Sequence, residues 1–344
     1  MKPVLFAAAL ATLAAAAGAM IAADAAALQR FERPWRERAQ DPAGEVDLPL
    51  ETLRHDGEER SFLISRPLGA APRAGVPVVI GLHGGGSGDA AMAASVQRFH
   101  LIDAGEPLLV VYPNGIGAEW NDGRGAAFKR TGDPEADDVG FLSALIDHLI
   151  AREGADPARI YLAGASNGAM MTHRAGCELA GKLAALAPVI APMPANVAMR
   201  CDPARPTPIL MILGEDDPWV PFHGGEVTPL GRPSGEVIPA DETMALWAEA
   251  NRCSPRPVVS HDRGRPARDG TRIRRETYQR CAAATAMIVV EGGGHGWPGS
   301  TRAGRAAQRL LGQTTRQLDA TEEIWAFFRD QRRFSSRTGR HDPR

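Results

Sequence analysis

A serine lies at the centre of a glycine-bounded pentapeptide, Gly164-Ala165-Ser166-Asn167-Gly168. The pentapeptide follows a short apolar run, Ile160 to Ala163, and precedes a segment rich in small residues. Between a strand and a helix, Gly-x-Ser-x-Gly forms a sharp turn that exposes the serine hydroxyl. The glycines are required because side chains in such a strained turn would clash with neighbouring elements. The pattern predicts that Ser166 is a nucleophile, and the alternative is an ordinary Gly/Ser turn.

A histidine and a group of acids follow Ser166 along the chain, each directly after an apolar run. His295 lies in a glycine-rich loop after one run, and Glu215, Asp216 and Asp217 follow another. A serine hydroxyl is a weak nucleophile near neutral pH, so it needs a base to take its proton. The base in turn needs an acid that holds its correct tautomer. His295 is the expected base, and the three acids compete for the second role.

A second glycine-rich loop, His83-Gly84-Gly85-Gly86-Ser87-Gly88, follows the apolar run Val76 to Leu82. Its backbone N–H groups could stabilise the negative charge that develops on an attacked carbonyl, at about 2.7–4 kcal/mol for one donor. The N–H of Asn167, the residue after the serine, would be a second donor. A phosphate-binding loop is the competing interpretation, but the Lys-Ser/Thr ending and its spacing are missing. His83 is expected to orient the loop rather than to transfer protons.

The motifs follow short apolar runs that do not alternate with polar residues, which is typical of strands buried on both faces. The runs are Val76 to Leu82, Leu108 to Tyr112, Ile160 to Ala163, Ile209 to Leu213 and Met287 to Val290. Helical spacing lies between or after them, at 139–149, 240–250 and 320–330, and Asp137 and Asp138 are placed to cap the first helix. The alternation predicts an α/β fold with a mostly parallel central sheet and helices on both faces. Ligands bind at the strand ends of such sheets.

Two further strands are expected before this alternating region, at 46–53 and 61–65. Asp56-Gly57 between them is a dipeptide that favours a tight hairpin turn. The sequence therefore predicts an antiparallel hairpin at the N-terminal side of the sheet.

The composition limits the class of protein. The formal net charge of −2 argues against a nucleic-acid-binding protein, which would need a strongly basic face. Hydrophobic content of 44% and charged content of 23% are ordinary for a soluble globular chain. The sequence contains no Cys-x-x-Cys motif and no Cys/His cluster that would indicate a zinc site. No cofactor is expected.

The sequence also predicts how the chain is divided into segments. Lys2 and the apolar, alanine-rich run after it are typical of a signal peptide over residues 1–25, and an uncleaved membrane anchor is the alternative. Residues 26–43 are expected to be a flexible lead-in, 44–331 one catalytic domain, and 332–344 a disordered basic tail. The protein is then secreted, to the periplasm or the extracellular space, with no membrane contact once the signal is removed.

Four cysteines fit this export prediction, because oxidising compartments permit disulfides. Four cysteines allow three connectivities, and pairing of nearest neighbours, Cys177 with Cys201 and Cys253 with Cys281, is the simplest. The alternative is four buried thiols.

Together these segments resemble the polyhydroxybutyrate depolymerase and feruloyl esterase group, the carbohydrate esterase family 1 branch of the α/β-hydrolases. The resemblance covers roughly 51–328. It rests on the acid and histidine segments and on Leu82-His83-Gly84, Trp120-Asn121, Asp137-Asp138-Val139 and Tyr161 to Gly168. The resemblance implies an α/β-hydrolase fold and a triad in the chain order serine, acid, histidine.

The resemblance also implies particular roles. Alignment of Val220-Pro221 with the family's Val-Pro places the catalytic acid at Asp217, and the oxyanion donor after His-Gly falls on Gly85. It further implies a Cys253–Cys281 disulfide. This chain departs from the family pattern at three positions, where it has Leu213, Glu215 and Gly296. These departures bear on substrate preference rather than on the triad.

The expected activity is hydrolysis of carboxylic esters through an acyl-enzyme, with Ser166, Asp217 and His295 as the triad. The preferred substrate is a short-chain hydroxyalkanoate polyester or its oligomers, and the alternative is a feruloyl or acetyl ester of plant polysaccharide. A catalytically inactive binding protein on a hydrolase scaffold is the alternative of another class. The ester is the one expected partner, and the oligomeric state is not predicted. Side chains beside the motifs are candidates to line the substrate pocket, or else to pack the loops: His83, Trp120, Trp219 and Trp297.

Overall fold

The computed structural model describes residues 46–333 except 70–71, 87, 126–132, 134, 263–268 and 301–304. The expected signal peptide, the lead-in and nearly all of the basic tail lie outside the described residues. Backbone contacts separate Met1–Asp47 from Leu48–Arg344, and every element named below belongs to the second unit. Within the described part of the chain, no helix has both the length and the apolar character needed to cross a membrane.

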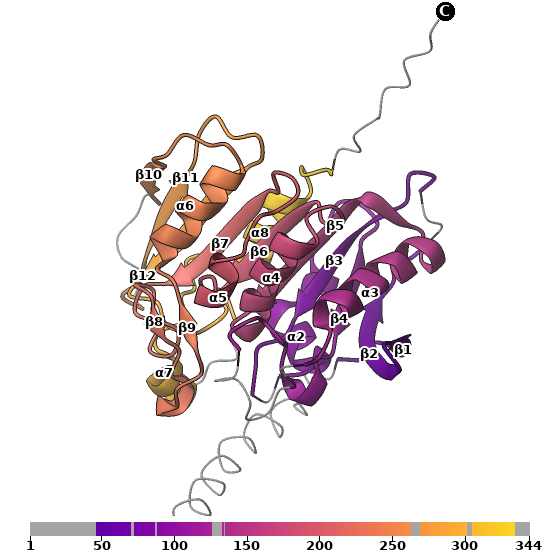
Figure 1. The fold of residues 1–344 in the computed structure, drawn as a ribbon, viewed down its shortest axis with the longest axis horizontal. Coiled ribbons are helices and arrows are strands. Elements are labelled where there is room, and N and C mark those ends of the chain that lie inside the picture. Colours follow the sequence, from indigo (N-terminus) through magenta and orange to yellow (C-terminus); the bar gives the residue numbers. More distant parts are fainter. Residues whose placement is uncertain are drawn as a thin grey trace, which may run out of the picture. The chain divides into compact units, whose positions relative to one another are not determined.

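A ten-stranded sheet, in the order β1-β2-β4-β3-β5-β6-β7-β12-β11-β10, forms the centre of this unit (Figure 1). Pairing is parallel from β4 through β12, and it is antiparallel at both ends. The strands are β1 (Leu50–His55), β2 (Glu58–Ser65), β3 (Val76–Leu82), β4 (Leu109–Pro113), β5 (Ala155–Ala165), β6 (Ala185–Val189), β7 (Ile209–Gly214), β10 (Val258–His261), β11 (Arg272–Thr277) and β12 (Thr285–Glu291). A separate two-stranded sheet pairs β8 (Gly225–Glu226) with β9 (Glu236–Val237).

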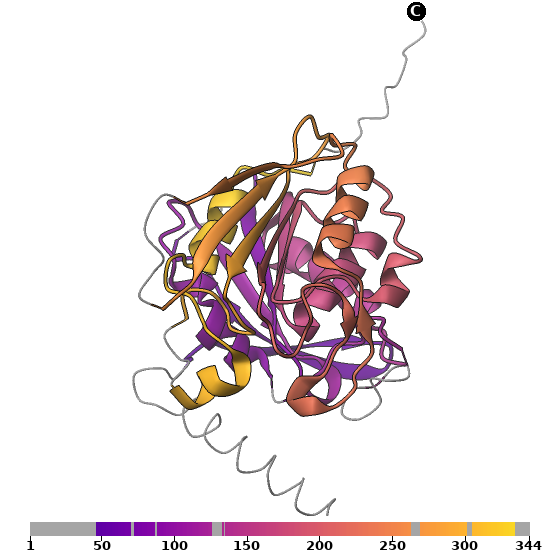
Figure 2. The ribbon, with the colours of Figure 1, turned by 90° about the vertical axis from the view of Figure 1, so that its left-hand side faces the viewer.

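Helices cover both faces of the large sheet, as the alternating pattern predicts. They are α2 (Ala90–Gln97), α3 (Asp138–Arg152), α4 (Asn167–Glu178), α5 (Ala195–Ala198), α6 (Ala240–Ala250), α7 (Arg305–Leu311) and α8 (Ala320–Phe328). In Figure 2, α8 lies on one side of the sheet, and α4 and α6 lie on the other. The start of α8 meets the end of α2, because the Thr321 hydroxyl donates to the Gln97 carbonyl at 2.6 Å.

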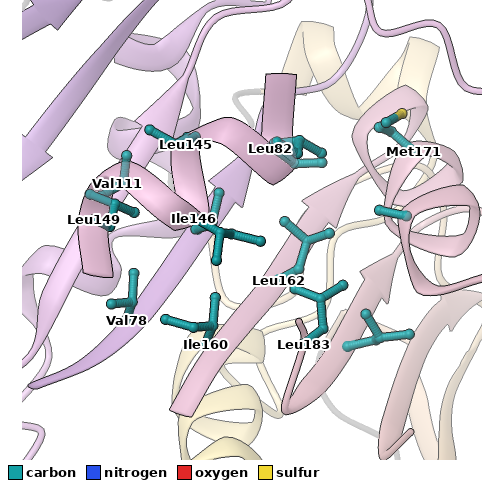
Figure 3. Packing of buried hydrophobic residues seen from close by; sticks show 14 of the residues in the cluster. Val78, Leu82, Val111, Leu145, Ile146, Leu149, Ile160, Leu162, Met171 and Leu183 are labelled. Carbon is teal, nitrogen blue, oxygen red and sulfur yellow. The ribbon is translucent and has the colours of Figure 1, made fainter. Parts of the chain in front are cut away.

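The buried core explains why the strands read as continuous apolar runs. All seven residues of β3 are buried, because helices cover both of its faces. Figure 3 shows Leu145, Ile146 and Leu149 of α3 beside strand residues such as Val78 and Ile160. The α3 N-terminus is capped as expected, because the Asp137 carboxylate accepts the Gly140 N–H at 2.9 Å.

The N-terminal hairpin is confirmed with a shorter first strand. β1 begins at Leu50, and His55 pairs with Glu58 across a two-residue turn. Both turn residues, Asp56 at φ 49° and Gly57 at φ 82°, adopt the left-handed conformation that suits such a turn.

Both disulfides join nearest neighbours. Cys177, near the end of α4, bonds Cys201, and Cys253, just after α6, bonds Cys281 before β12. The simplest connectivity is therefore confirmed, and the alternative of four thiols is wrong.

Candidate active site

Ser166 stands at the sharp turn between β5 and α4, with φ 55° and ψ −117°. This backbone conformation is strained for a residue with a side chain. The flanking glycines make it possible, because a Cβ on Gly164 would lie 2.1 Å from the Gly168 carbonyl oxygen. A Cβ on Gly168 would lie 2.4 Å from the carbonyl oxygen of His83. The turn is held to the sheet by Ser166 N–H, which donates to the Val189 carbonyl at 3.0 Å.

His295 follows β12 and reaches the serine directly. Its Nε2 lies 2.9 Å from Ser166 Oγ. Main-chain bonds from a later segment hold the loop, since Gly294 N–H donates to the Gln313 carbonyl at 2.8 Å and His295 N–H to that of Leu311. The residue is buried, with 6% of its surface exposed.

Asp217 is the acid that meets the histidine. Its Oδ2 lies 2.6 Å from His295 Nδ1, and its Oδ1 accepts the N–H groups of Trp219 and Val220 at 2.8 and 2.9 Å. Glu215 instead pairs with Arg274 at 3.1 Å. The structure therefore brings Asp217, rather than Glu215, into contact with the imidazole.

The glycine-rich loop after β3 lies against the serine. A Cβ on Gly84 would be 3.5 Å from Ser166 Cβ, and Gly85 sits against the Glu119 carboxylate. His83 orients the loop from within the core. Its Nδ1 donates to the Gly84 carbonyl at 2.7 Å, and its Nε2 accepts the Gly115 N–H at 2.9 Å.

Both ring nitrogens of His83 thus serve the backbone, and the ring is neutral. Burial lowers the pKa of His83 to about 4, more strongly than the bond to Gly84 raises it. At neutral pH this side chain therefore holds the loop without carrying charge.

Asn167 begins α4, where the first N–H groups of a helix have no partner within the helix. Its side chain is buried, and both its amide oxygen and its amide nitrogen form hydrogen bonds. Oδ1 accepts the Trp120 N–H at 2.8 Å, and Nδ2 donates to the Trp120 carbonyl at 3.0 Å and to Asp122 Oδ2 at 2.6 Å. The backbone N–H of Asn167 therefore has a fixed position beside Ser166.

Three of the four side chains that were candidates for the substrate pocket are closed off from solvent. His83, Trp120 and Trp297 are 1%, 0% and 4% exposed. Trp120 Nε1 donates to the His83 carbonyl at 3.1 Å, and Trp297 Nε1 to the Thr321 hydroxyl at 3.2 Å. This burial corrects the pocket prediction for these three residues, because their rings and polar atoms are used in packing.

Trp219 is different. It is partly exposed, and its ring centroid lies 5.2 Å from that of His295. Of the four candidates, it alone presents a partly exposed aromatic ring next to His295.

Sequence reasoning missed a buried ion pair behind the site, Asp122 with Arg124. Asp122 follows the Trp120-Asn121 motif directly, so its position was visible in the sequence. Nothing in the sequence marks it as buried, because that depends on Arg124 and Asn167 enclosing it.

Three described side chains have the spacing of metal ligands, Glu51, His148 and Glu153. Arg66 donates to both glutamates, at 2.7 Å to Glu51 and at 2.7 and 2.8 Å to Glu153. The two carboxylates are therefore already paired with a cation.

The strand order and the serine turn with its histidine and acid define an α/β-hydrolase with the geometry of a serine hydrolase. The profile of the phospholipase/carboxylesterase family matches residues 71–229. NocK of Nocardia uniformis subsp. tsuyamanensis, which carries the name of an esterase, is 30% identical over 323 residues, 89% of this chain and 88% of that protein. The chain belongs to this carboxylesterase family and hydrolyses carboxylic esters.

Two further similar proteins carry names with a substrate. Feruloyl esterase B of Piromyces equi is 28% identical over 245 residues, 69% of this chain and 42% of that protein. Among solved structures, acetyl xylan esterase from Aspergillus awamori has a TM-score of 0.45 at 16% identity, over 72% of this chain and 94% of that chain. The family match and the similar sequences of NocK and feruloyl esterase B confirm the resemblance to the feruloyl esterase group at the level of the family.

Proposed function

We propose that Ser166, His295 and Asp217 are the catalytic triad of this esterase. The observation that carries the proposal is the continuous pair of hydrogen bonds, 2.9 Å from Ser166 Oγ to His295 Nε2 and 2.6 Å from His295 Nδ1 to Asp217. Each distance lies within the range in which a proton can be transferred or shared. The proposed catalytic domain is the segment 44–331.

The geometry supports a two-step reaction. His295 Nε2 takes the Ser166 hydroxyl proton as Oγ attacks the ester carbonyl, and it then gives that proton to the departing alcohol. The acyl group remains on Oγ. Water attacks the acyl-enzyme with His295 again as base, which releases the acid and restores the serine. Asp217 keeps the proton of the ring on Nδ1, so that Nε2 is free to accept.

We propose the backbone N–H groups of Gly85 and Asn167 as the oxyanion donors. Support comes from the position of the Gly84–Gly85 segment against Ser166 and from the N-terminus of α4 at Asn167. The helix end adds a partial positive charge where the carbonyl oxygen becomes negative.

For the substrate, we propose a feruloyl or acetyl ester of polysaccharide ahead of a hydroxyalkanoate polyester. The names of two feruloyl esterases and of a bifunctional acetylxylan esterase/xylanase, to whose sequences this chain is similar, favour this order. The partly exposed ring of Trp219 beside His295 could stack on a feruloyl ring or a sugar. Both classes place an ester carbonyl at the same serine.

We further propose that the protein acts outside the cytoplasm. Two disulfides between buried or half-buried segments support an oxidising compartment. The signal peptide expected over residues 1–25 would direct the chain there.

A panel of esters tests these proposals. The panel contains p-nitrophenyl acyl esters, methyl ferulate and hydroxybutyrate oligomers, each assayed with wild type, Ser166→Ala and the control Ser260→Ala on the exposed strand β10. We expect Ser166→Ala to abolish turnover and Ser260→Ala to retain it. Turnover by Ser166→Ala equal to wild type would refute the triad, and a higher kcat/KM for hydroxybutyrate oligomers than for methyl ferulate would refute the substrate order.

If wild type hydrolyses none of these esters, the alternative of an inactive binding protein on a hydrolase scaffold replaces the proposal.

A further inference from the structure

A buried ion pair lies directly behind the proposed oxyanion donor Asn167. The side chains of Asp122 and Arg124 are 0% and 4% exposed, and Arg124 NH2 lies 2.8 Å from Asp122 Oδ2. Burial of two charges is costly unless each is paired and its remaining hydrogen-bonding groups are satisfied. Here the remaining hydrogen-bonding partners of the pair come from the candidate active site itself.

Donors from Asn167 and Arg124 converge on the Asp122 carboxylate. Oδ2 accepts from Asn167 Nδ2 at 2.6 Å and from Arg124 Nε at 2.8 Å, and Oδ1 accepts the Arg124 backbone N–H at 3.1 Å. The bond from Asn167 is short because a carboxylate is a stronger acceptor than a neutral carbonyl. The carboxylate thus restrains the residue whose peptide N–H is proposed to stabilise the oxyanion.

Arg124 extends this restraint to a second part of the site. Its NH1 donates to the carbonyl and hydroxyl oxygens of Ser234 at 2.7 and 3.1 Å, in the segment before β9. Ser234 N–H donates to the Val227 carbonyl, and the next residue, Thr228, donates to the carbonyl of Trp219. The ion pair therefore joins Asn167 to the loop that carries Trp219.

We propose that Asp122 is a positioning residue for ester hydrolysis, which acts by holding Asn167 so that its backbone N–H points at the oxyanion. This inference rests on the proposed triad and oxyanion hole. Arg124 neutralises the carboxylate, so that no net negative charge stands behind the site where the oxyanion forms. An asparagine at position 122 would be nearly isosteric, but it would remove the negative charge that strengthens the bond from Asn167 Nδ2, and in one of its two amide orientations it would direct an N–H group at that donor.

The chain provides a matched control in Asp138. This second aspartate also has a 0% exposed side chain and pairs with an arginine, Arg60, at 2.6 Å. Its other oxygen accepts the N–H of Asn121, in the same segment as Asp122. The Asp138 carboxylate bonds Arg60 and Asn121 rather than Asn167, so Asp138→Asn removes comparable chemistry without touching the proposed oxyanion donor.

The experiment compares wild type, Asp122→Asn and Asp138→Asn in the full chain. kcat and KM are measured with p-nitrophenyl acetate, affinity with butylboronic acid, and stability by thermal unfolding. A boronic acid forms a tetrahedral adduct on a reactive serine and places an oxygen where the oxyanion would lie. For Asp122→Asn we expect kcat to fall about 10- to 100-fold with KM nearly unchanged, and boronic acid affinity to fall by a similar factor.

We expect Asp138→Asn to unfold at a lower temperature while kcat and boronic acid affinity stay within about threefold of wild type. Equal losses of kcat in the two variants would overturn the proposal, because the effect would then be general destabilisation. If Asp122→Asn does not fold, Asn167→Ala replaces it, since this variant keeps the backbone N–H and loses the restraint. Wild-type kcat and boronic acid affinity in Asn167→Ala would overturn the proposal as well.

Failure of the proposed triad is distinguished by Ser166→Ala. If Ser166→Ala retains turnover, the triad is wrong. If it is inactive and Asp122→Asn behaves like Asp138→Asn, only the positioning role is wrong.

Discussion

The neutral, buried state of His83 makes the stability of this esterase sensitive to mild acid. Its pKa is lowered from an ordinary 6.5 to about 4 in the folded protein, chiefly by burial. Between these values the unfolded chain binds a proton at this site and the folded chain does not. The stability that neutral His83 contributes to the folded protein is therefore fully present above pH 6.5 and is lost as the pH falls toward 4. At pH 5 this difference in proton binding lowers the free energy of unfolding by about 2 kcal/mol.

His83→Gln isolates this effect, because glutamine can also donate and accept one hydrogen bond but does not titrate. The free energy of unfolding is measured in urea from pH 8 to pH 5 by tryptophan fluorescence, for wild type, His83→Gln and the exposed control His223→Gln. We expect wild type to lose about 2 kcal/mol more than His83→Gln over this range. His173 is also buried, and burial lowers its pKa to about 3. It is present in all three proteins, so its effect on the pH dependence cancels in the comparison.

Parallel curves for wild type and His83→Gln would refute the reasoning, since they would mean that His83 takes up its proton equally in the folded and unfolded states. A smaller pH dependence in His223→Gln than in wild type would place the effect elsewhere in the molecule.

Asp217→Asn should lower kcat by about four orders of magnitude with the fold intact, because the imidazole loses the acceptor that fixes its tautomer; steady-state kinetics and circular dichroism test this, and a loss below tenfold contradicts it. Gly168→Ala should cost about 1–3 kcal/mol in urea unfolding, because its Cβ would lie 2.4 Å from a carbonyl oxygen of the adjoining loop. Gly181→Ala, with no atom within 4 Å of its Cβ, should cost far less. Replacement of Cys253 and Cys281 by alanine removes a disulfide that closes a loop of 28 residues, and it should lower stability by about 3.6 kcal/mol in the entropic model. Unchanged unfolding midpoints in that double variant would show that the link contributes nothing.

The parallel strands of the core were predictable because helices bury both of their faces. β3 has the expected bounds, Val76–Leu82, since every one of its residues is apolar or glycine or proline and all are buried. β6 was missed, because Ala185–Val189 contains two alanines and a proline, residues that are rare in central strands.

β11 was missed for a different reason. Its residues Arg272–Thr277 carry several charges, and some of their partners lie far along the chain, as in the ion pair of Arg275 with Glu323 at 2.7 Å. A sequence window shows the charges, but the partners that permit them in a strand come from the tertiary structure.

Within the site, the spacing of Ser166 and His295 after apolar runs was sufficient to place them together. The choice of Asp217 among three acids needed the resemblance, because neighbouring carboxylates differ only in the direction that the loop gives them. Trp120 and Trp219 both adjoin motif residues, yet one is buried and the other partly exposed. That difference depends on which other segments pack on each ring, such as His83 beside Trp120.

The loop that carries His295 is held by main-chain bonds to Leu311 and Gln313, and its imidazole meets a serine 129 positions earlier. During synthesis the proposed nucleophile Ser166 therefore leaves the ribosome long before the segment that anchors His295, the proposed base. A chain that is stalled or cut short before residue 313 would contain the serine turn but no supported base. With the proposed triad, esterase activity would accordingly report synthesis through residue 313 and folding of that segment, whereas the presence of the serine turn alone would report neither.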